Sequence, residues 1–182
     1  MQQFKVGVIG ATGMVGQRFL TLLAEHPWFD VTVLAASSRS AGKTYENAVD
    51  AKWAFPCPIP EKFAKMMIFD AEADIDQIAS KVDFVFCAVS LDKVATRELE
   101  EKYAKAEIPV VSNNSAHRFT KDVPMVIPEI NDGHLDVIPA QKARLGTKRG
   151  FIAVKSNPRS KIKRPSAIIG GGVIAFSKPS GV

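Results

Sequence analysis

The chain of 182 residues has few cysteines, no long apolar run and no acidic residue after Asp136. Because Cys57 and Cys87 are the only cysteines, a disulfide scaffold is excluded and a reducing compartment is expected. No apolar run approaches the roughly 20 residues of a membrane-spanning helix, and the first residues lack the layout of a signal peptide. These absences favour a cytoplasmic globular protein with no membrane partner.

Charge is unevenly distributed along the chain. Residues 1–139 hold 14 basic and 19 acidic residues, a net charge of −5, whereas residues 140–182 hold ten basic and no acidic residues. A basic segment can bind nucleic acid or an anionic surface. Aromatic residues do not alternate with these charges, as a single-strand-binding surface requires. A solvated basic tail is therefore the simpler interpretation, and a nucleic-acid partner is not expected.

Strand and helix patterns alternate over residues 4–112 and predict an α/β fold, a Rossmann-like doubly wound parallel sheet. Three further short segments follow: Pro124–Pro128 is predicted to be extended, Asn131–Val137 a short helix or turn, and Phe151–Lys155 a strand that opens a second domain. Residues 44–65, which hold three prolines, are predicted to be mostly irregular, and residues 139–150 to be a basic connector with Gly146 and Gly150. The strands expected in the first part are Phe4–Ile9, Val31–Ala36, Met66–Phe69, Phe84–Val89 and Val110–Val111, and the helices are Met14–His26, with Val15, Phe19, Leu22 and Leu23 on its apolar face, Ile75–Ser80, and Asp92–Lys105, with Val94, Leu99 and Tyr103 inside.

A glycine motif, Gly10-Ala-Thr-Gly13-Met-Val-Gly16, lies between the first strand and the first helix. Gly10 permits a tight turn, Gly13 lets the backbone approach a pyrophosphate, and Gly16 lets the helix pack closely. Free N–H groups at the start of the helix can then hold phosphates. In this strand–turn–helix context the motif predicts dinucleotide binding.

The end of the second strand indicates which dinucleotide. An acidic residue there accepts the ribose 2′-hydroxyl of NAD, but this chain has Ala36-Ser-Ser-Arg-Ser40. Arg39 and the hydroxyls of Ser37 and Ser40 can instead donate to a 2′-phosphate. The pattern favours NADP over NAD, the alternative being a polar loop with one exposed arginine.

Four segments together resemble one enzyme family, aspartate-semialdehyde dehydrogenase, in the branch found in fungi and archaea. They are Gly-Ala-Thr-Gly-Met-Val-Gly (10–16), Ser-Arg-Ser-Ala-Gly-Lys (38–43), Ser-Asn-Asn-Ser-Ala-His-Arg (112–118) and Val-Pro-Met-Val-Ile-Pro-Glu-Ile-Asn (123–131). The resemblance covers about residues 3–157. It implies the NADPH-dependent reductive dephosphorylation of L-aspartyl-4-phosphate to L-aspartate 4-semialdehyde, a step of lysine, threonine and methionine biosynthesis.

The resemblance also implies roles for individual residues. Ser90 lines the nicotinamide side, Asn113 and Asn114 lie at the junction of cofactor and substrate, and Arg118 grips the acyl phosphate or free phosphate, a role that suits a guanidinium. The residues implied in cofactor binding are Gly10, Thr12, Gly13, Met14, Val15, Gly16, Ser37, Arg39, Ser40, Ser90 and Asn113, and those implied in substrate or phosphate binding are Asn114 and Arg118.

The chain departs from the family at Pro158, where the resemblance places the catalytic cysteine after Asn157. No catalytic residue is therefore assigned. Cys87 is expected to be an inert buried thiol and Cys57 to be poorly placed for attack. The three histidines do not match the family's base: His117 belongs to the substrate-loop motif, and His26 and His134 are expected to be surface or packing residues. Two cysteines and scattered histidines give no metal-binding spacing.

The expected organisation is an NADP-binding domain over residues 1–150, the start of a catalytic and dimerisation domain over residues 151–157, and a divergent basic tail over residues 158–182. On this view the chain is a truncated enzyme without turnover of its own, from a family of homo-oligomers whose interface it largely lacks. Two alternatives stay open: a related acyl-phosphate or acyl-CoA reductase, and a non-catalytic NADP-binding or regulatory protein that pairs with a full-length subunit.

Overall fold

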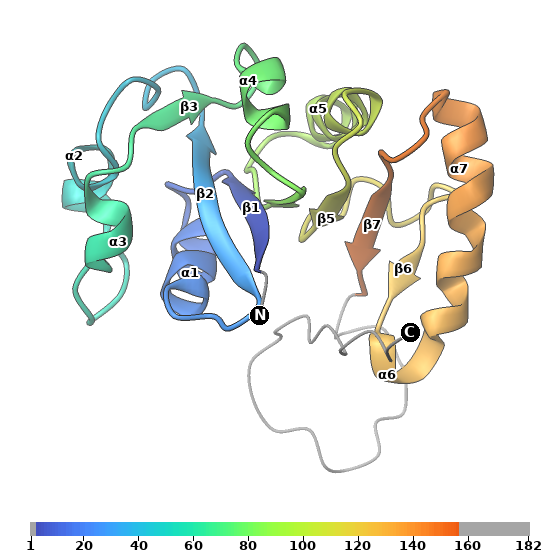
Figure 1. The fold of residues 1–182 in the computed structure, drawn as a ribbon, viewed down its shortest axis with the longest axis horizontal. Coiled ribbons are helices and arrows are strands. Elements are labelled where there is room, and N and C mark those ends of the chain that lie inside the picture. The colour runs from blue at the N-terminus through green and yellow to red at the C-terminus, as the bar shows by residue number, and fades with distance from the viewer. Residues whose placement is uncertain (1–2, 157–182) are drawn as a thin grey trace.

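The computed structural model describes residues 3–156, which form one seven-stranded parallel sheet. The order of the strands is β3-β2-β1-β4-β5-β7-β6, so that β3 and β6 are the two edges (Figure 1). From β1 the successive strands β2 and β3 are added toward one edge, whereas β4 and β5 are added toward the other, so the switch point of the doubly wound fold lies between β1 and β4. The strands are β1 (Phe4–Ile9), β2 (Phe29–Ala36), β3 (Ile68–Asp70), β4 (Phe84–Cys87), β5 (Val110–Ser112), β6 (Met125–Val126) and β7 (Ile152–Lys155).

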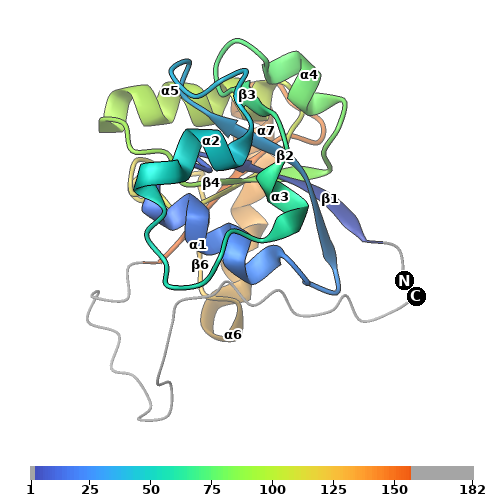
Figure 2. The same ribbon diagram turned by 90° about the vertical axis from the view of Figure 1, so that its left-hand side faces the viewer.

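Helices cover both faces of the sheet, as Figure 2 shows for α1 on one side and α4 and α5 on the other. Each face has its own apolar core. Leu20 and Leu23 of α1 pack with Tyr45 and Phe63 on one face, and Leu99 and Tyr103 of α5 pack with Leu145 on the other. The helices are α1 (Met14–Leu23), α2 (Tyr45–Val49), α3 (Glu61–Ala64), α4 (Ile75–Ala79), α5 (Lys93–Lys105), α6 (Pro128–Asn131) and α7 (Ile138–Leu145), with 3₁₀ turns η1 (Asp50–Lys52) and η2 (Asp132–Val137).

The predicted parallel, doubly wound sheet is confirmed, and its predicted elements form with shifted ends. The first helix ends at Leu23, three residues before the predicted His26. Asp92 caps α5 as expected of an aspartate at that position, because its side chain accepts hydrogen bonds from the backbone N–H groups of Val94 and Ala95.

Three predictions on helical residues were wrong. Val94, predicted to lie inside, is 64% exposed, and Val15 and Leu22 on α1 are also exposed. Their places in the core are taken by Gly16, Gln17 and Leu20 on α1 and by Thr96 and Glu100 on α5. Polar side chains therefore occupy inward positions that periodicity assigns to apolar ones.

Two predictions on segments were also wrong: that residues 44–65 are mostly irregular, and that residues 139–150 are a connector between elements. The first segment holds α2, η1 and α3, and the second holds most of α7. Gly146 ends α7 in the left-handed conformation with φ +72°, and Pro139 lies in the first turn of that helix.

The strand predicted at Phe151–Lys155 forms as β7 and pairs with β5 and β6 in the same sheet. Gln141 of α7 fixes it there, because its side-chain amide exchanges hydrogen bonds with the backbone N–H and C=O of Ile152. The domain boundary expected at residue 151 stays a prediction, and the tail over residues 158–182 lies outside the described residues. In residues 3–156 no helix is long and apolar enough to cross a membrane.

Candidate functional site

The glycine turn between β1 and α1 has the geometry that its three glycines require. Gly10 has φ +85°, and a Cβ there would lie 2.6 Å from the backbone oxygen of Ala88. A Cβ on Gly16 would lie 2.2 Å from the backbone oxygen of Gly10, so only glycine lets α1 approach the turn this closely. Gly13 differs: a Cβ there would have only the Gly10 oxygen, at 3.5 Å, within 4 Å among the described residues. The space over Gly13 is therefore open to a ligand.

The start of α1 is suited to an anion. Gly13 is the N-cap, no side chain in the described region caps the helix, and the first turn holds no acidic residue. The N–H groups of the first turn thus keep their partial positive charge available. Met14 and Val15, at 70% and 43% exposed, border these groups.

Gln17 holds the turn in place. Its buried side chain donates hydrogen bonds to the backbone oxygens of Thr12 (3.0 Å) and Lys52 (2.9 Å) and accepts one from the N–H of Ala54 (2.9 Å). On the other side, the Tyr45 hydroxyl donates to the backbone oxygen of Ala11 (3.0 Å). The glycine turn is in this way tied to the segment that follows β2.

A hollow of about 440 Å³, called here the first hollow, lies between this turn and the loop after β2. Four residues predicted from the sequence line it together: Thr12, Ser37, Arg39 and Ser40. Two lysines outside the predicted set bring the number of cationic side chains in its lining to three. The other lining residues are Lys43, Asn47, Ala48, Asp50, Ala51 and Lys52.

A smaller hollow of about 80 Å³, called here the second hollow, lies after β4 and β5. It adjoins the glycine turn, because Gly10 packs against the backbone of Ala88 and Val89 and Val89 lines this hollow. Asn114 is the predicted site residue among its lining. Ser90 and Asn113 are in the segments that form it but are not part of its lining, which consists of Val89, Leu91, Lys93, Thr96, Asn114, Ser115 and Ala116.

A buried polar cluster lies behind the second hollow. Glu100 of α5 is fully buried, and its Oε1 accepts hydrogen bonds from the Ser112 hydroxyl (2.5 Å) and from Nδ2 of Asn114 (2.9 Å). The backbone N–H of Asn114 donates to Oγ of Ser112 (3.0 Å). His117, also buried, has its Nε2 3.9 Å from Oε2 of Glu100. Burial lowers the pKa of this imidazole below its usual value, against the opposing influence of the Glu100 charge.

Arg118 follows this cluster and lies near Lys155 at the end of β7. Burial lowers the pKa of Lys155, and the positive charge of Arg118 lowers it further. No carboxylate in residues 3–156 pairs with either cation, and Nε of Arg118 is buried without a hydrogen-bond partner in the same region. Two neighbouring cations without a counter-ion form a suitable place for an anion.

The remaining side chains behave largely as expected. Cys87 is buried, and burial together with Glu100 raises its thiol pKa well above the usual value, so that it is unreactive. Cys57 is exposed. His26 packs on Phe29 with ring centroids 4.6 Å apart, and His134 binds the backbone of Met125. Pro158, where the family cysteine is expected, lies outside the described residues.

Sequence reasoning missed several residues of these two hollows. Lys43 ends a motif that was recognised, and Ser112 immediately precedes Asn113, so both carried a signal. Gln17 and Glu100 carried none, because a polar residue on a helix is ordinarily a solvated one.

Comparison with known proteins supplies a family for this arrangement. Residues 5–138 match the family model described as semialdehyde dehydrogenase, NAD binding domain. Among curated proteins, the aspartate-semialdehyde dehydrogenase of Archaeoglobus fulgidus is 45% identical over 157 residues, and that of Aspergillus fumigatus is 42% identical over 153 residues.

A solved structure gives the same result for the fold. The crystal structure of aspartate semialdehyde dehydrogenase with NADP from Candida albicans has a TM-score of 0.71 and 38% identity, covering 86% of this chain and 43% of that one. The two curated relatives match over 85% and 84% of this chain, which spans 43% and 40% of their own lengths.

Proposed function

Since the chain belongs to the semialdehyde dehydrogenase family, whose NAD-binding domain it matches, we propose that residues 3–156 are the NADP-binding part of an aspartate-semialdehyde dehydrogenase. The reaction of that enzyme is the NADPH-dependent reduction of L-aspartyl-4-phosphate to L-aspartate 4-semialdehyde and phosphate. The observation that carries the proposal is the first hollow, in which Arg39, Ser37 and Ser40 gather beside the glycine turn.

The residues present fit NADP at each phosphate. The pyrophosphate is assigned to the turn from Gly10 to Gly16, where Thr12, Met14 and Val15 offer backbone N–H groups and Gly13, whose own N–H donates to the Gly10 oxygen, leaves room for the phosphate. The 2′-phosphate is assigned to Arg39, Ser37 and Ser40, whose charge and hydroxyls suit a dianion. The acidic residue that would select the 2′-hydroxyl of NAD is absent at this place.

The nicotinamide half extends toward the second hollow, past Ser90 and Asn113. When bound in its reduced form, the cofactor supplies the hydride of the reaction. Asn114 is assigned to the junction of cofactor and substrate, and Arg118 to the substrate side. Arg118 and the neighbouring Lys155 are proposed to hold the acyl phosphate and the phosphate that it releases, because their charges have no protein counter-ion within the described residues.

Neither cysteine of the described residues lines either hollow. Cys87 is held inert by burial, and Pro158 takes the position where the family cysteine is expected. The purified chain is therefore expected to bind NADP and to show no phosphate-dependent reduction of NADP with aspartate semialdehyde. Turnover by the chain alone would overturn this part of the proposal.

Thermal unfolding with and without nucleotide tests the cofactor assignment. A ligand at a hundred times its dissociation constant adds about 2.7 kcal/mol to the free energy of unfolding. NADP is expected to raise the unfolding temperature cooperatively, and NAD at the same concentration to raise it much less. An equal response to both nucleotides would overturn the role of Arg39, and no response to either would overturn the cofactor proposal.

A second candidate is a regulatory NADP-binding protein that pairs with a full-length subunit. Co-purification with an intact homologue, measured by light scattering after size exclusion, would distinguish a regulatory partner from an independent enzyme.

We also propose, from membership of the family, that the protein is cytoplasmic and forms homo-oligomers. Free Cys57 and Cys87 suit the reducing cytoplasm, and the family assembles into homo-oligomers. Exposed apolar side chains such as Phe119, at 92% exposed, and Ile130 are available for contacts with another subunit. A concentration-dependent mass in sedimentation would support self-association.

A further inference from the structure

Asn114 lies where the second hollow meets the buried cluster around Glu100. The two hollows lie on either side of the glycine turn, at the switch point between β1 and β4. In a fold of this class the two halves of a dinucleotide lie on the two sides of that point. If the first hollow takes the adenosine half, the second hollow, after β4 and β5, faces the nicotinamide half.

The chemistry of Glu100 determines which way the Asn114 amide points. A carboxylate oxygen accepts hydrogen bonds and does not donate them, so the nitrogen and not the oxygen of the amide must face it. Nδ2 of Asn114 lies 2.9 Å from Oε1 of Glu100 and 3.5 Å from Sγ of Cys87, which places its donors on the protein side. The carbonyl oxygen of the amide has no donor within the described residues and is left for a ligand.

The backbone of Asn114 is fixed by the same carboxylate. The Ser112 hydroxyl donates its one hydrogen to Glu100 at 2.5 Å, so its oxygen is free to accept from the N–H of Asn114 at 3.0 Å. Glu100 and Ser112 are both fully buried, so water does not compete for these bonds. The position and the polarity of Asn114 thus depend on one buried side chain of α5.

We propose that Glu100 is a positioning residue that turns the carbonyl oxygen of Asn114 toward the second hollow, where it accepts a hydrogen bond from the carboxamide NH₂ of the bound nicotinamide. The nicotinamide ring is then held by its amide group in one orientation. The inference rests on the proposed function, because it presupposes a dinucleotide in the first hollow.

The test compares three probes on the purified chain: NADP, its nicotinic acid analogue, and 2′,5′-ADP. The analogue carries a carboxylate in place of the carboxamide, so it has no hydrogen to donate and places a negative charge against the Asn114 oxygen. The wild type is expected to bind NADP about tenfold more tightly than the analogue, the value of one well-placed hydrogen bond. Affinities are measured by titration calorimetry.

Glu100→Gln is the decisive variant. The amide nitrogen of a glutamine can donate to Asn114, which lets the asparagine turn its NH₂ toward the hollow, where it favours the carboxylate. The preference for NADP over the analogue is expected to vanish or reverse, while affinity for 2′,5′-ADP stays the same. Glu101→Gln, the same change one residue along α5, is the matched control and is expected to retain the tenfold preference.

The outcomes separate the inference from the proposed function. A Glu100→Gln variant that folds and keeps the tenfold preference overturns the inference. So does a wild type that binds NADP and 2′,5′-ADP but does not distinguish NADP from its analogue. If neither NADP nor 2′,5′-ADP binds, the proposed function fails and the inference with it.

Two further variants cover a Glu100→Gln chain that does not fold. Asn114→Ala removes the acceptor itself, and Ser112→Ala removes the hydroxyl through which Glu100 holds the Asn114 backbone. Each is expected to lower the preference for NADP without changing affinity for 2′,5′-ADP. An unchanged preference in Asn114→Ala overturns the inference, and an unchanged preference in Ser112→Ala shows that the direct Glu100–Asn114 bond is sufficient to orient the amide.

Discussion

The two hollows beside the glycine turn differ in what lies behind their functional side chains. The first is lined by exposed cations: Arg39 and Lys43 in the loop after β2, and Lys52 at the end of η1. The second has Asn114 at its surface and a fully buried carboxylate, Glu100, behind it. Charge is therefore held in solvent at one hollow and inside the protein at the other.

Because of this difference, side chains of the first hollow should affect ligand affinity, whereas those behind the second should affect folding stability as well. An exposed cation acts on a ligand through water and contributes little to folding. A buried carboxylate with two hydrogen-bonded donors contributes to folding, because removing it leaves those donors without a partner. Substitutions at the first hollow should change ligand binding alone, whereas substitutions behind the second should change both.

The largest expected effect is that of Glu100→Ala on stability. The variant leaves the buried Ser112 hydroxyl and the partly buried Asn114 amide without their acceptor, and should lower the free energy of unfolding by about 2–4 kcal/mol. Urea denaturation at pH 7 measures the change. Glu101→Ala, which loses a surface ion pair with Arg144, should cost about 1 kcal/mol or less. Equal losses in the two variants would remove the contrast between the hollows.

The next effect is that of Arg39→Ala on selectivity. Losing a charged donor to the 2′-phosphate should weaken NADP binding about ten- to hundredfold and leave NAD binding and stability unchanged. Calorimetric titration with both nucleotides measures the ratio. Arg18→Ala is the control, since Arg18 is exposed and contacts Phe55 outside the first hollow. A parallel loss of NAD affinity in Arg39→Ala would mean that the arginine does not read the 2′-phosphate.

A smaller effect on stability and on NADP binding is expected from Tyr45, a buried side chain that holds the glycine turn beside the first hollow. Tyr45 and Tyr103 are both buried, burial raises the pKa of both phenols, and each donates to a backbone oxygen, of Ala11 and Ala71 respectively. Tyr45→Phe and Tyr103→Phe should each cost about 1 kcal/mol of stability in thermal unfolding. Because Ala11 belongs to the glycine turn, the Tyr45 variant alone should also weaken NADP binding. Identical NADP affinities would show that the turn keeps its shape without this bond.

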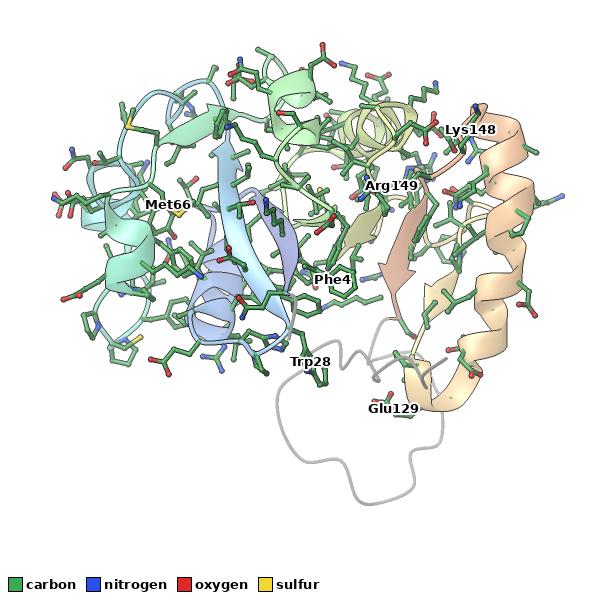
Figure 3. The ribbon with its side chains drawn as sticks, in the orientation of Figure 1. Phe4, Trp28, Met66, Glu129, Lys148 and Arg149 are labelled. Carbon is green, nitrogen blue, oxygen red and sulfur yellow. The ribbon has the colours of Figure 1, made fainter. Side chains whose placement is uncertain are left out.

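The smallest effect concerns a partly exposed carboxylate, that of Glu107, which accepts hydrogen bonds from the backbone. Glu107 has φ +63° and accepts hydrogen bonds from the N–H groups of Lys148, Arg149 and Gly150, two of which belong to residues labelled in Figure 3. These bonds, with that of Lys148 the strongest influence, lower the pKa of Glu107 from 4.5 to about 2.

The stabilisation by Glu107 therefore exists above about pH 4.5 and is lost as the pH falls toward 2. The difference in unfolding temperature between wild type and Glu107→Gln should be largest above pH 5 and shrink as the pH falls toward 2. Glu98→Gln, an exposed change on α5, serves as the control and should show no such trend. A difference that is constant with pH would contradict the role of the backbone bonds.

The sheet and its glycine turn were predictable because their signals are local. Continuous apolar runs such as Phe84–Val89, and a glycine at each crowded point, follow from the covalent chain and from steric limits. The helices in residues 44–65 and 139–150 were not predicted, because prolines and glycines in these segments were interpreted as marks of a loop or connector. Three prolines suggested a loop in the first segment, and in the second Pro139 and Gly146 in fact mark the two ends of a helix.

The residues behind the site were not predictable in the same way. Glu100 and Gln17 lie at helical positions where a polar side chain ordinarily faces solvent, and each is buried because its partners come from a distant segment. Ser112 is 12 residues from Glu100, and Lys52 is 35 residues from Gln17. Periodicity describes one element at a time, so it cannot supply a partner that another element brings.

Gln17 has a kinetic consequence. Its three hydrogen bonds, to Thr12, Lys52 and Ala54, hold the glycine turn in one shape before any nucleotide arrives. The entropy of ordering that loop is lost during folding and not during binding. Association is then expected to be a single step whose rate rises in proportion to nucleotide concentration. Nucleotides of different affinity should differ mainly in how long they remain bound.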